Sequence, residues 1–321
     1  MKTIGNRRIL LLFGIAGVLG VLINGCIKDN SAELAAQEQA EIDTYLADNN
    51  ISKDTKTVDG IYYIEEVAGT GDSIKFGDYM LINYTGKNLD GTLIETNDSA
   101  TAANAGSYNE YFVYHPMKLR FGYSLLGINI GISYMREGGK ATLIIPSSLA
   151  NNDYKPLVYT IELLRVIKDP VADAKNDLNS YLSMLDTTKY QIDDHKVMPS
   201  DSLASGIYYI VTDSVAANTD NIVSGDSVYM AFTGYFTDGK SFNSASSSSP
   251  YAFIYGQTNL ISGVNEALGY MHEGTKARVI IPYYEGYGAD GYSPPSYSFQ
   301  LIPPYSTIIF DIDIVRHKKN S

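Results

Sequence analysis

The sequence YMREGGKATLIIP, residues 134–146, recurs as YMHEGTKARVIIP at residues 270–282. In each copy a short helix is predicted to end at a glycine, Gly138 or Gly274. The run of β-branched apolar residues that follows is typical of a buried strand. A chain that contains the same helix-to-strand unit twice is expected to contain the same domain twice.

The repetition extends into the flanking sequence. Residues 59–64, DGIYYI, match residues 205–210, SGIYYI, and residues 82–91, INYTGKNLDG, match residues 230–239, MAFTGYFTDG. The motifs keep their order and spacing, so chance similarity between apolar runs explains them poorly. Each copy is long enough to bury its own core, which predicts tandem globular domains and not a solenoid.

Composition supports two packed domains and limits the partners. The length of 321 residues fits two domains, and a hydrophobic content of 45% is enough for two cores. The formal net charge of -12 argues against nucleic acid and against adhesion to an anionic membrane by charge alone. Most aromatic residues are tyrosines, 27 in all, which favours β-rich domains with half-exposed strands.

The N-terminus has the features of a targeting segment. Basic residues precede an apolar run at residues 9–23, which is too short to span a bilayer reliably. The only cysteine, Cys26, follows this run and resembles the acylated cysteine of bacterial lipoproteins, although an uncleaved anchor with an incidental cysteine is the alternative. Lipidation at Cys26 would anchor the protein in the bacterial cell envelope, with the outer membrane favoured and the membrane face left open.

A helix is predicted before each copy, at residues 31–49 with Ser31 as a candidate N-cap, and at residues 173–185. We expect a spacer or a docking element against the domain's own sheet, because neither apolar stripe is long enough for a coiled coil. Short strand-like runs follow, with one helical interruption before the fifth, which predicts an α+β domain whose antiparallel sheet wraps a short helix. In the first copy these runs are residues 60–67, 78–84, 91–94, 118–122, 140–145 and 158–166.

The second copy resembles a known family over nearly all of residues 204–316. Its segments occur in the order of the successive signatures of FKBP-type peptidyl-prolyl cis-trans isomerases, whose fold is a curved antiparallel sheet around a short helix. The segments are VYMAFTGYFTDGKSFN (228–243), PYAFIYG (250–256), LISGVNEALGYMHEG (260–274), ARVIIP (277–282), GYG (286–288) and LIPPYSTIIFDIDIV (301–315).

The resemblance and the repeat together divide the chain. The expected parts are a signal peptide at residues 1–25, a lipidated N-terminus with its helix at 26–56, a degenerate FKBP-like domain at 57–168, a helical linker at 169–203 and an isomerase domain at 204–318.

The resemblance also implies a set of site residues in the second copy. The backbone N–H of Ile261 and the hydroxyl of Tyr287 would donate to substrate carbonyls, and aromatic residues would form a cup for the proline ring. The implied catalytic residues are Phe242, Asn243, Ile261, Tyr287 and Phe310; the implied substrate-binding residues are Phe232, Tyr251, Phe253, Leu260, Val264 and Ile302.

Three of these positions depart from the family pattern. Phe232 replaces the usual tyrosine, Asn243 replaces an aspartate, and Val264 stands where a large residue often forms the floor. Asn243 can still form hydrogen bonds but carries no charge. Val264 predicts a wider, shallower cup and slower turnover. Ile302, together with the two prolines after it, is expected on the rim.

The first copy keeps less of the pattern. Its loop corresponding to the Ile302 segment is missing, and a longer segment, residues 97–115, is inserted before Pro116. We interpret this copy as a non-catalytic module that binds, spaces or dimerises. Tyr84, Leu119 and Tyr159 persist at equivalent places, whereas Ile94, Glu95 and Met117 replace the aromatic and acidic residues and Asn151 replaces Tyr287.

Other chemistries find little support. The four histidines show no metal-ligand spacing, and the motifs for a serine nucleophile, a P-loop or a dinucleotide are absent from the sequence. We therefore expect an isomerase without metal or cofactor that acts on proline-containing exported or envelope polypeptides. The alternatives are a non-catalytic binding or chaperone module and a structural subunit of a surface complex. The client, the oligomeric state and macrolide binding stay open.

Overall fold

The structure is a computed structural model that describes residues 30–110, 112–185, 202–213, 220–295 and 300–320. The expected signal peptide, Cys26 and part of the expected linker lie outside these residues. Within the described part of the chain, no helix is both long and apolar enough to cross a membrane.

The first domain is built on a six-stranded antiparallel sheet with the order β1-β5-β6-β2-β3, and β4 also pairs with β2. A short helix, α3 (Leu126–Ser133), packs against β5 and β6, where Ile128 and Ile132 enter the core. The strands are β1 (Tyr62–Val67), β2 (Tyr79–Asn88), β3 (Leu93–Thr96), β4 (Met117–Arg120), β5 (Gly139–Ile145) and β6 (Leu157–Ile167), with a 3-10 turn at Ser147–Leu149.

The second domain repeats this plan. Its sheet has the order β10-β8-β12-β11-β7, β9 also pairs with β8, and the helix α5 (Ser262–Leu268) packs against β11. The strands are β7 (Tyr208–Asp213), β8 (Ser227–Phe236), β9 (Ser241–Ala245), β10 (Tyr251–Ile254), β11 (Lys276–Ile281) and β12 (Ile308–Lys318), with a 3-10 turn at Tyr283–Glu285.

The two sheets share a register as well as an order. Gly86 pairs with Tyr159 in the first domain, and Gly234 pairs with Phe310 in the second. Each pair joins the TG dipeptide of the repeated strand to an aromatic residue of the long last strand. The predicted α+β architecture, with an antiparallel sheet around a short helix in each domain, is confirmed.

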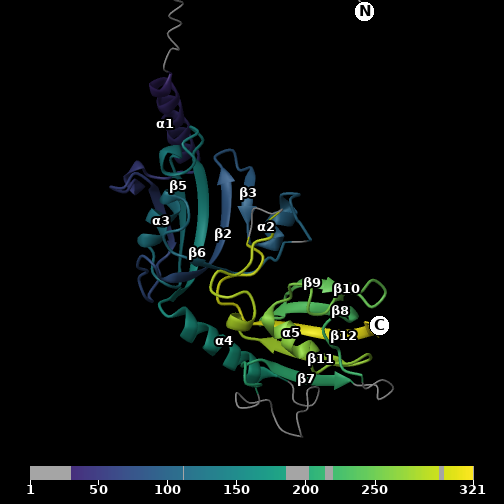
Figure 1. Cartoon of the computed structure of the whole chain (residues 1–321). Coiled ribbons are helices and arrows are strands. Elements are labelled where there is room, and N and C mark those ends of the chain that lie inside the picture. Colours follow the sequence, from purple (N-terminus) through teal and green to yellow (C-terminus); the bar gives the residue numbers. More distant parts are fainter. Residues whose placement is uncertain (1–29, 111, 186–201, 214–219, 296–299, 321) are drawn as a thin grey trace, which may run out of the picture.

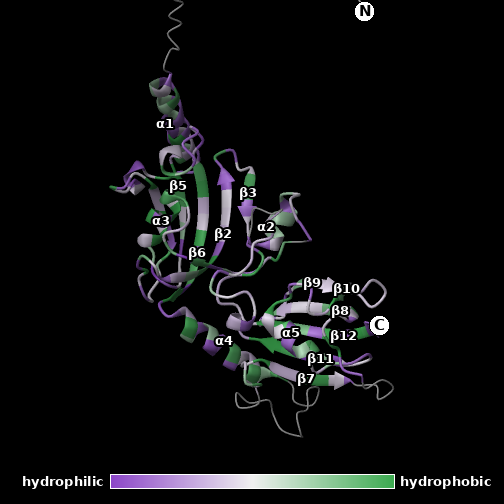
Figure 2. Cartoon of the chain, in the orientation of Figure 1, coloured by the Kyte–Doolittle hydropathy of each residue, from purple (hydrophilic) through white to green (hydrophobic). Residues whose placement is uncertain are grey.

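Each domain carries its leading helix on the other face of its sheet. Ile42 and Leu46 of α1 (Ser31–Asp48) pack against β1, β5 and β6, and Leu182 of α4 (Pro170–Met184) packs against β7, β11 and β12. Figure 2 shows both helices as mixtures of hydrophilic and hydrophobic residues, as expected for helices with one buried stripe. Both helices are therefore docking elements of their own domains.

The helix α4 also forms ion pairs with the first domain. Its residue Asp173 forms ion pairs with Lys118 of β4 at 2.8 Å and with Arg165 of β6 at 2.9 Å. The Lys118 side chain is only 7% exposed, so this pair is shielded from solvent. Figure 1 shows α4 running between the two domains, and the helix is thus fixed to both of them.

Three local predictions were wrong. The helices α3 and α5 end at Ser133 and Leu268, several residues before Gly138 and Gly274, and these glycines instead form turns with φ of +82° and +87°. A second helix, α2 (Ser99–Asn104), lies in the inserted segment, where Asp98 caps it by accepting from the Thr101 N–H. The N-cap of α1 is Asn30, and Ser31 is already helical.

Candidate functional site

A cavity of about 630 Å³ opens on the helix side of the second sheet. Residues from β8, β9, β12, the start of α5 and the segment after the 3-10 turn converge on it. Eight of the residues implied by the resemblance line this cavity: Phe232, Asn243, Tyr251, Leu260, Ile261, Val264, Tyr287 and Phe310.

Aromatic rings form a continuous wall along one side of the cavity. The Phe232 ring lies 5.7 Å from that of Phe310 and 6.5 Å from that of Tyr251. Phe310 in turn meets Phe242 edge-on, with 5.6 Å between ring centroids. These distances fall in the favourable range for tilted and T-shaped aromatic pairs, so the rings support one another in place.

The floor of the cavity is the first turn of α5. Val264 is 4% exposed and belongs to the core of the domain. Ile261 is the N-cap of the helix, and no described residue accepts a hydrogen bond from its backbone N–H. The first N–H groups of a helix lack intrahelical partners, so this donor is available to a ligand in the cavity.

Tyr287 supplies a second donor. Its ring is half-buried and stacks on Tyr292, with 5.2 Å between centroids. Burial raises the pKa of Tyr287, and the nearby Tyr292 raises it further. Its hydroxyl therefore stays protonated at neutral pH, and no partner for it is found among the described residues.

The cavity is uncharged. Its described lining is aromatic, aliphatic, amide and hydroxyl, and none of these residues is Asp, Glu, Lys, Arg or His. Such a site can remove water from an amide and offer it directed N–H and O–H donors. The described lining places no Asp, Glu, Lys or His beside its serine hydroxyls to act as a base, an arrangement that suits a change of conformation in a bound chain better than the breaking of a bond.

Three implied residues lie behind the lining. Phe242 packs between Phe236 and Phe310, and Phe253 is buried and stacks on Tyr251 with 5.4 Å between centroids. Ile302 was expected on the rim, but it is 1% exposed and belongs to the core. Its backbone bonds to both the N–H and the carbonyl of Tyr292, so Ile302 supports the rim from inside.

Tyr292 is the main lining residue that sequence reasoning missed. It belongs to a tyrosine-rich stretch and stands outside every motif of the resemblance, so nothing in the sequence distinguished it. Its bridge to Ile302 places it beside Tyr287. The other unpredicted lining residues are Met230, Ser244, Ala245, Ser249, Pro250 and Asn259.

The equivalent hollow of the first domain is smaller, about 200 Å³. Tyr159, which occupies the register position of Phe310, donates its hydroxyl at 2.7 Å to Glu95, one of the residues that line this hollow. Phe112 and Tyr114 of the inserted segment also line it, and Phe112 packs against the core. The first domain thus fills with its own side chains the space that the second domain leaves open.

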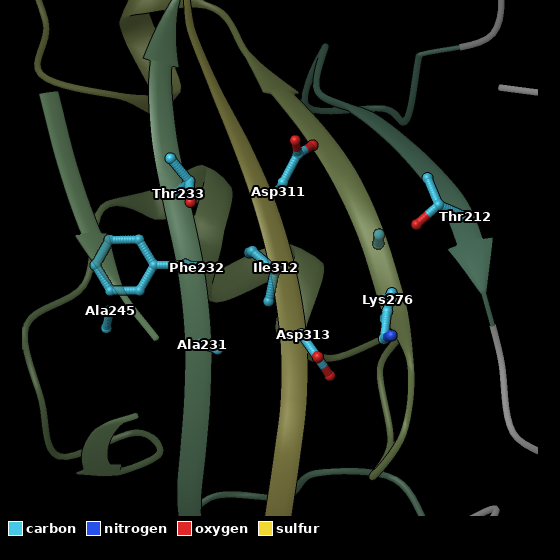
Figure 3. Close-up of a pocket in the computed structure, with 10 residues that line it drawn as sticks. Thr212, Ala231, Phe232, Thr233, Ala245, Lys276, Asp311, Ile312 and Asp313 are labelled. Carbon is cyan, nitrogen blue, oxygen red and sulfur yellow. The ribbon is translucent and has the colours of Figure 1, made fainter. Parts of the chain in front are cut away.

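A second hollow, of about 470 Å³, lies mainly on the opposite face of the second sheet and has charged residues in its lining, Lys276, Asp311 and Asp313. Figure 3 shows Thr212, Thr233 and Asp311 projecting from three of its strands. Asp311 is already engaged by Arg278, through two hydrogen bonds of 2.6 Å. No cluster of His, Cys, Asp and Glu able to hold a metal exists in the described residues, so this hollow is a weaker candidate than the aromatic cavity.

Comparison with known proteins places similarity in the second domain. Residues 218–315 match the family model described as FKBP-type peptidyl-prolyl cis-trans isomerase. The chain is 33% identical over 95 residues to an FK506-binding protein of Neisseria meningitidis serogroup C, covering 29% of this chain and 82% of that protein. It is 37% identical over 92 residues to a peptidyl-prolyl cis-trans isomerase of Schizosaccharomyces pombe, covering 28% of this chain and 77% of that protein.

A third relative shows how far the similarity extends. The chain is 36% identical over 114 residues to FK506-binding protein 4 of Dictyostelium discoideum, covering 36% of this chain and 29% of that protein. The chain therefore spans less than a third of the length of that relative.

Proposed function

The chain belongs to the FKBP-type peptidyl-prolyl cis-trans isomerase family, and from this premise we propose that its second domain catalyses the rotation of X-Pro peptide bonds. The clients are exported or envelope polypeptides that contain proline. The observation that carries the proposal is the uncharged aromatic cavity with two available donors, the Ile261 N–H and the Tyr287 hydroxyl.

The chemistry needs no more than such a cavity supplies. An X-Pro bond rotates slowly, over tens of seconds, because resonance keeps the amide planar with a barrier of about 18–20 kcal/mol. The rings of Phe232 and Phe310 would take the proline ring out of water, which disfavours the polar planar amide relative to the twisted one. An acceleration of about four orders of magnitude corresponds to about 5.5 kcal/mol, which a few contacts specific to the twisted form can provide.

The first domain does not catalyse under this proposal. Its hollow measures only about 200 Å³, against about 630 Å³ in the second domain, and Phe112 and Tyr114 of the inserted segment line it, so it is a poorer receptacle for a proline ring and its flanking chain. Lipidation at Cys26 would tether both domains to a membrane of the bacterial cell envelope, as expected from the sequence. The outer membrane is favoured, and neither leaflet is assigned.

A proline-limited peptide assay on the full chain tests the activity. Tyr287→Phe removes the hydroxyl donor. We expect kcat/KM to fall about tenfold, because losing one hydrogen bond between uncharged groups costs about 1.4 kcal/mol of transition-state stabilisation. Tyr284→Phe is the matched control, because Tyr284 is 55% exposed and lies outside the cavity lining. Equal rates for wild type and Tyr287→Phe would contradict the proposed role.

A binding or chaperone module is the second candidate. The departures at Phe232, Asn243 and Val264 favour it, because a cup without the usual charge and floor can hold a chain without turning it. A folded chain that binds proline-containing peptides but leaves their isomerisation rate unchanged would establish this function in place of the enzyme.

A further inference from the structure

The first domain contacts the second at two places, and each is linked through neighbouring residues to the lining of the aromatic cavity. At the first place, residues 112–115 at the end of the inserted segment reach the β8–β9 turn. At the second place, Tyr79 of β2 meets Tyr305 edge-on, with 5.4 Å between ring centroids. Figure 1 shows the yellow-green chain before β12 rising toward the first domain.

The inserted segment is anchored in both domains at once. Phe112 packs against the core of the first domain, and the next residue, Val113, packs against the core of the second. The carbonyl of Tyr114 accepts a hydrogen bond from the Lys240 ammonium group of the β8–β9 turn. His115 is 9% exposed, and its ring lies 4.6 Å from that of Phe236.

A chain of rings continues from this contact to the cavity. The Phe236 ring lies 5.0 Å from that of Phe242, and Phe242 lies 5.6 Å from Phe310, which lines the cavity. Close-packed interiors leave little room for one ring to move without its neighbour. The position of His115 in the first domain therefore constrains the wall of the site in the second.

The second contact leads to the segment that carries Tyr287. The backbone N–H of Tyr305 donates to the carbonyl of Gly288 at 3.1 Å, and Gly288 follows Tyr287 directly. Tyr305 has a φ of +54°, a conformation that a non-glycine residue adopts only where its surroundings hold it. The ring of Tyr79 is part of those surroundings.

We propose that the first domain is a positioning element of the second domain's site, acting through His115 on the aromatic wall and through Tyr79 on the segment that carries Tyr287. Neither residue lines the cavity, so both act through other residues. The inference rests on the proposed isomerase function and adds a role for the domain that lacks an open cavity of its own.

The experiment compares alanine with phenylalanine at the two positions in the full chain. The double variant His115→Ala, Tyr79→Ala loses both ring contacts, and we expect kcat to fall about fivefold while KM changes less than about twofold, because positioning acts mainly on the transition state. The double variant His115→Phe, Tyr79→Phe keeps both rings and should retain wild-type kcat. Lowered kcat in both variants, or in neither, would show that the first domain is only a tether.

A second measurement does not depend on turnover. Fluorophenylalanine labels the ten phenylalanines of the wild-type chain, and ¹⁹F NMR then reports on Phe242 and Phe310. Their resonances should move in the alanine variant and return in the phenylalanine variant. If the resonances do not move in the alanine variant, the positioning role is overturned, even for an active wild type. If they move but the wild type is inactive, only the isomerase function is overturned.

Discussion

Phe242 lies against the backbone of Gly234: a methyl group added to Gly234 would come within 2.6 Å of the Phe242 ring and 3.1 Å of the Phe310 ring. Side-chain atoms do not approach this closely, so the glycine is what allows the two rings to lie across β8. The first domain repeats the relationship, because a methyl group added to Gly86 would come within 2.6 Å of the Tyr159 ring.

Gly234→Ala should therefore push the rings of Phe242 and Phe310 out of place. We expect a loss of stability of about 1–3 kcal/mol from overpacking and a clear drop in kcat/KM for the protein that remains folded. Gly86→Ala is the matched control, because it creates the same clash away from the cavity. Thermal unfolding and the peptide assay together check this, and an equal loss of kcat/KM in both variants would refute it.

Turnover should not change with pH between about 6 and 9. The described lining of the cavity holds no Asp, Glu or His, and its titratable groups are tyrosines. Burial raises the pKa of Tyr287 above its ordinary value near 10, so the hydroxyl remains a donor throughout this range. A rate profile measured across the range with one peptide would disprove this if it were bell-shaped near neutrality.

Stability should fall in acid because of His115. Burial lowers the pKa of His115 to about 4; the nearby Asp238 works against this shift, and Lys240 adds to it. In the unfolded chain the value is near 6.5, so the unfolded state binds more protons between about pH 6.5 and 4 and gains relative stability there. His115→Phe should lose this part of the pH dependence in urea unfolding, and an unchanged slope would contradict the buried neutral form.

A second buried group acts at lower pH. Burial alone would raise the pKa of Asp226, but hydrogen bonds from the Val223 N–H, the His317 ring and the Asn320 N–H outweigh it and lower the pKa to about 2. The stability that Asp226 contributes is thus present above about pH 4 and is lost as the pH falls toward 2.

Asp226→Asn should cost about 1–3 kcal/mol at neutral pH, because the amide cannot accept all of these bonds. The matched control is Asp220→Asn, whose ion pair with Lys319 is exposed and should be worth under about 1 kcal/mol. Urea unfolding at pH 7 measures the loss of stability in each variant. Similar losses in the two variants would show that burial of the Asp226 pair contributes nothing to stability.

Much of the fold could be predicted from the sequence because strand periodicity and the internal repeat point the same way. The ends of α3 and α5 could not, since the apolar sequence continues past Ser133 and the glycine that seemed to stop the helix instead makes a turn. The helix α2 has no apolar stripe, only small residues after the capping Asp98, so nothing in its pattern distinguishes it from a loop.

The site was predictable to the extent that its residues fall within the motifs that resemble the family. Eight implied residues meet at one cavity, while Ile302 is buried because its backbone pairs with Tyr292 in a segment without recognisable pattern. The contact of His115 with Phe236 joins two domains and depends on their arrangement, which no local sequence feature specifies.

The most direct test of the central claim is the cis/trans exchange rate of an alanyl-proline peptide, measured by NMR exchange spectroscopy in the presence of the full chain. The account predicts that wild type accelerates exchange and that Phe310→Leu loses most of this acceleration. Tyr159→Leu, at the equivalent place in the first domain, should retain the full acceleration when the rate is divided by the concentration of folded protein. A folded wild-type chain that leaves the exchange rate unchanged, or equal rates for wild type and Phe310→Leu, would contradict it.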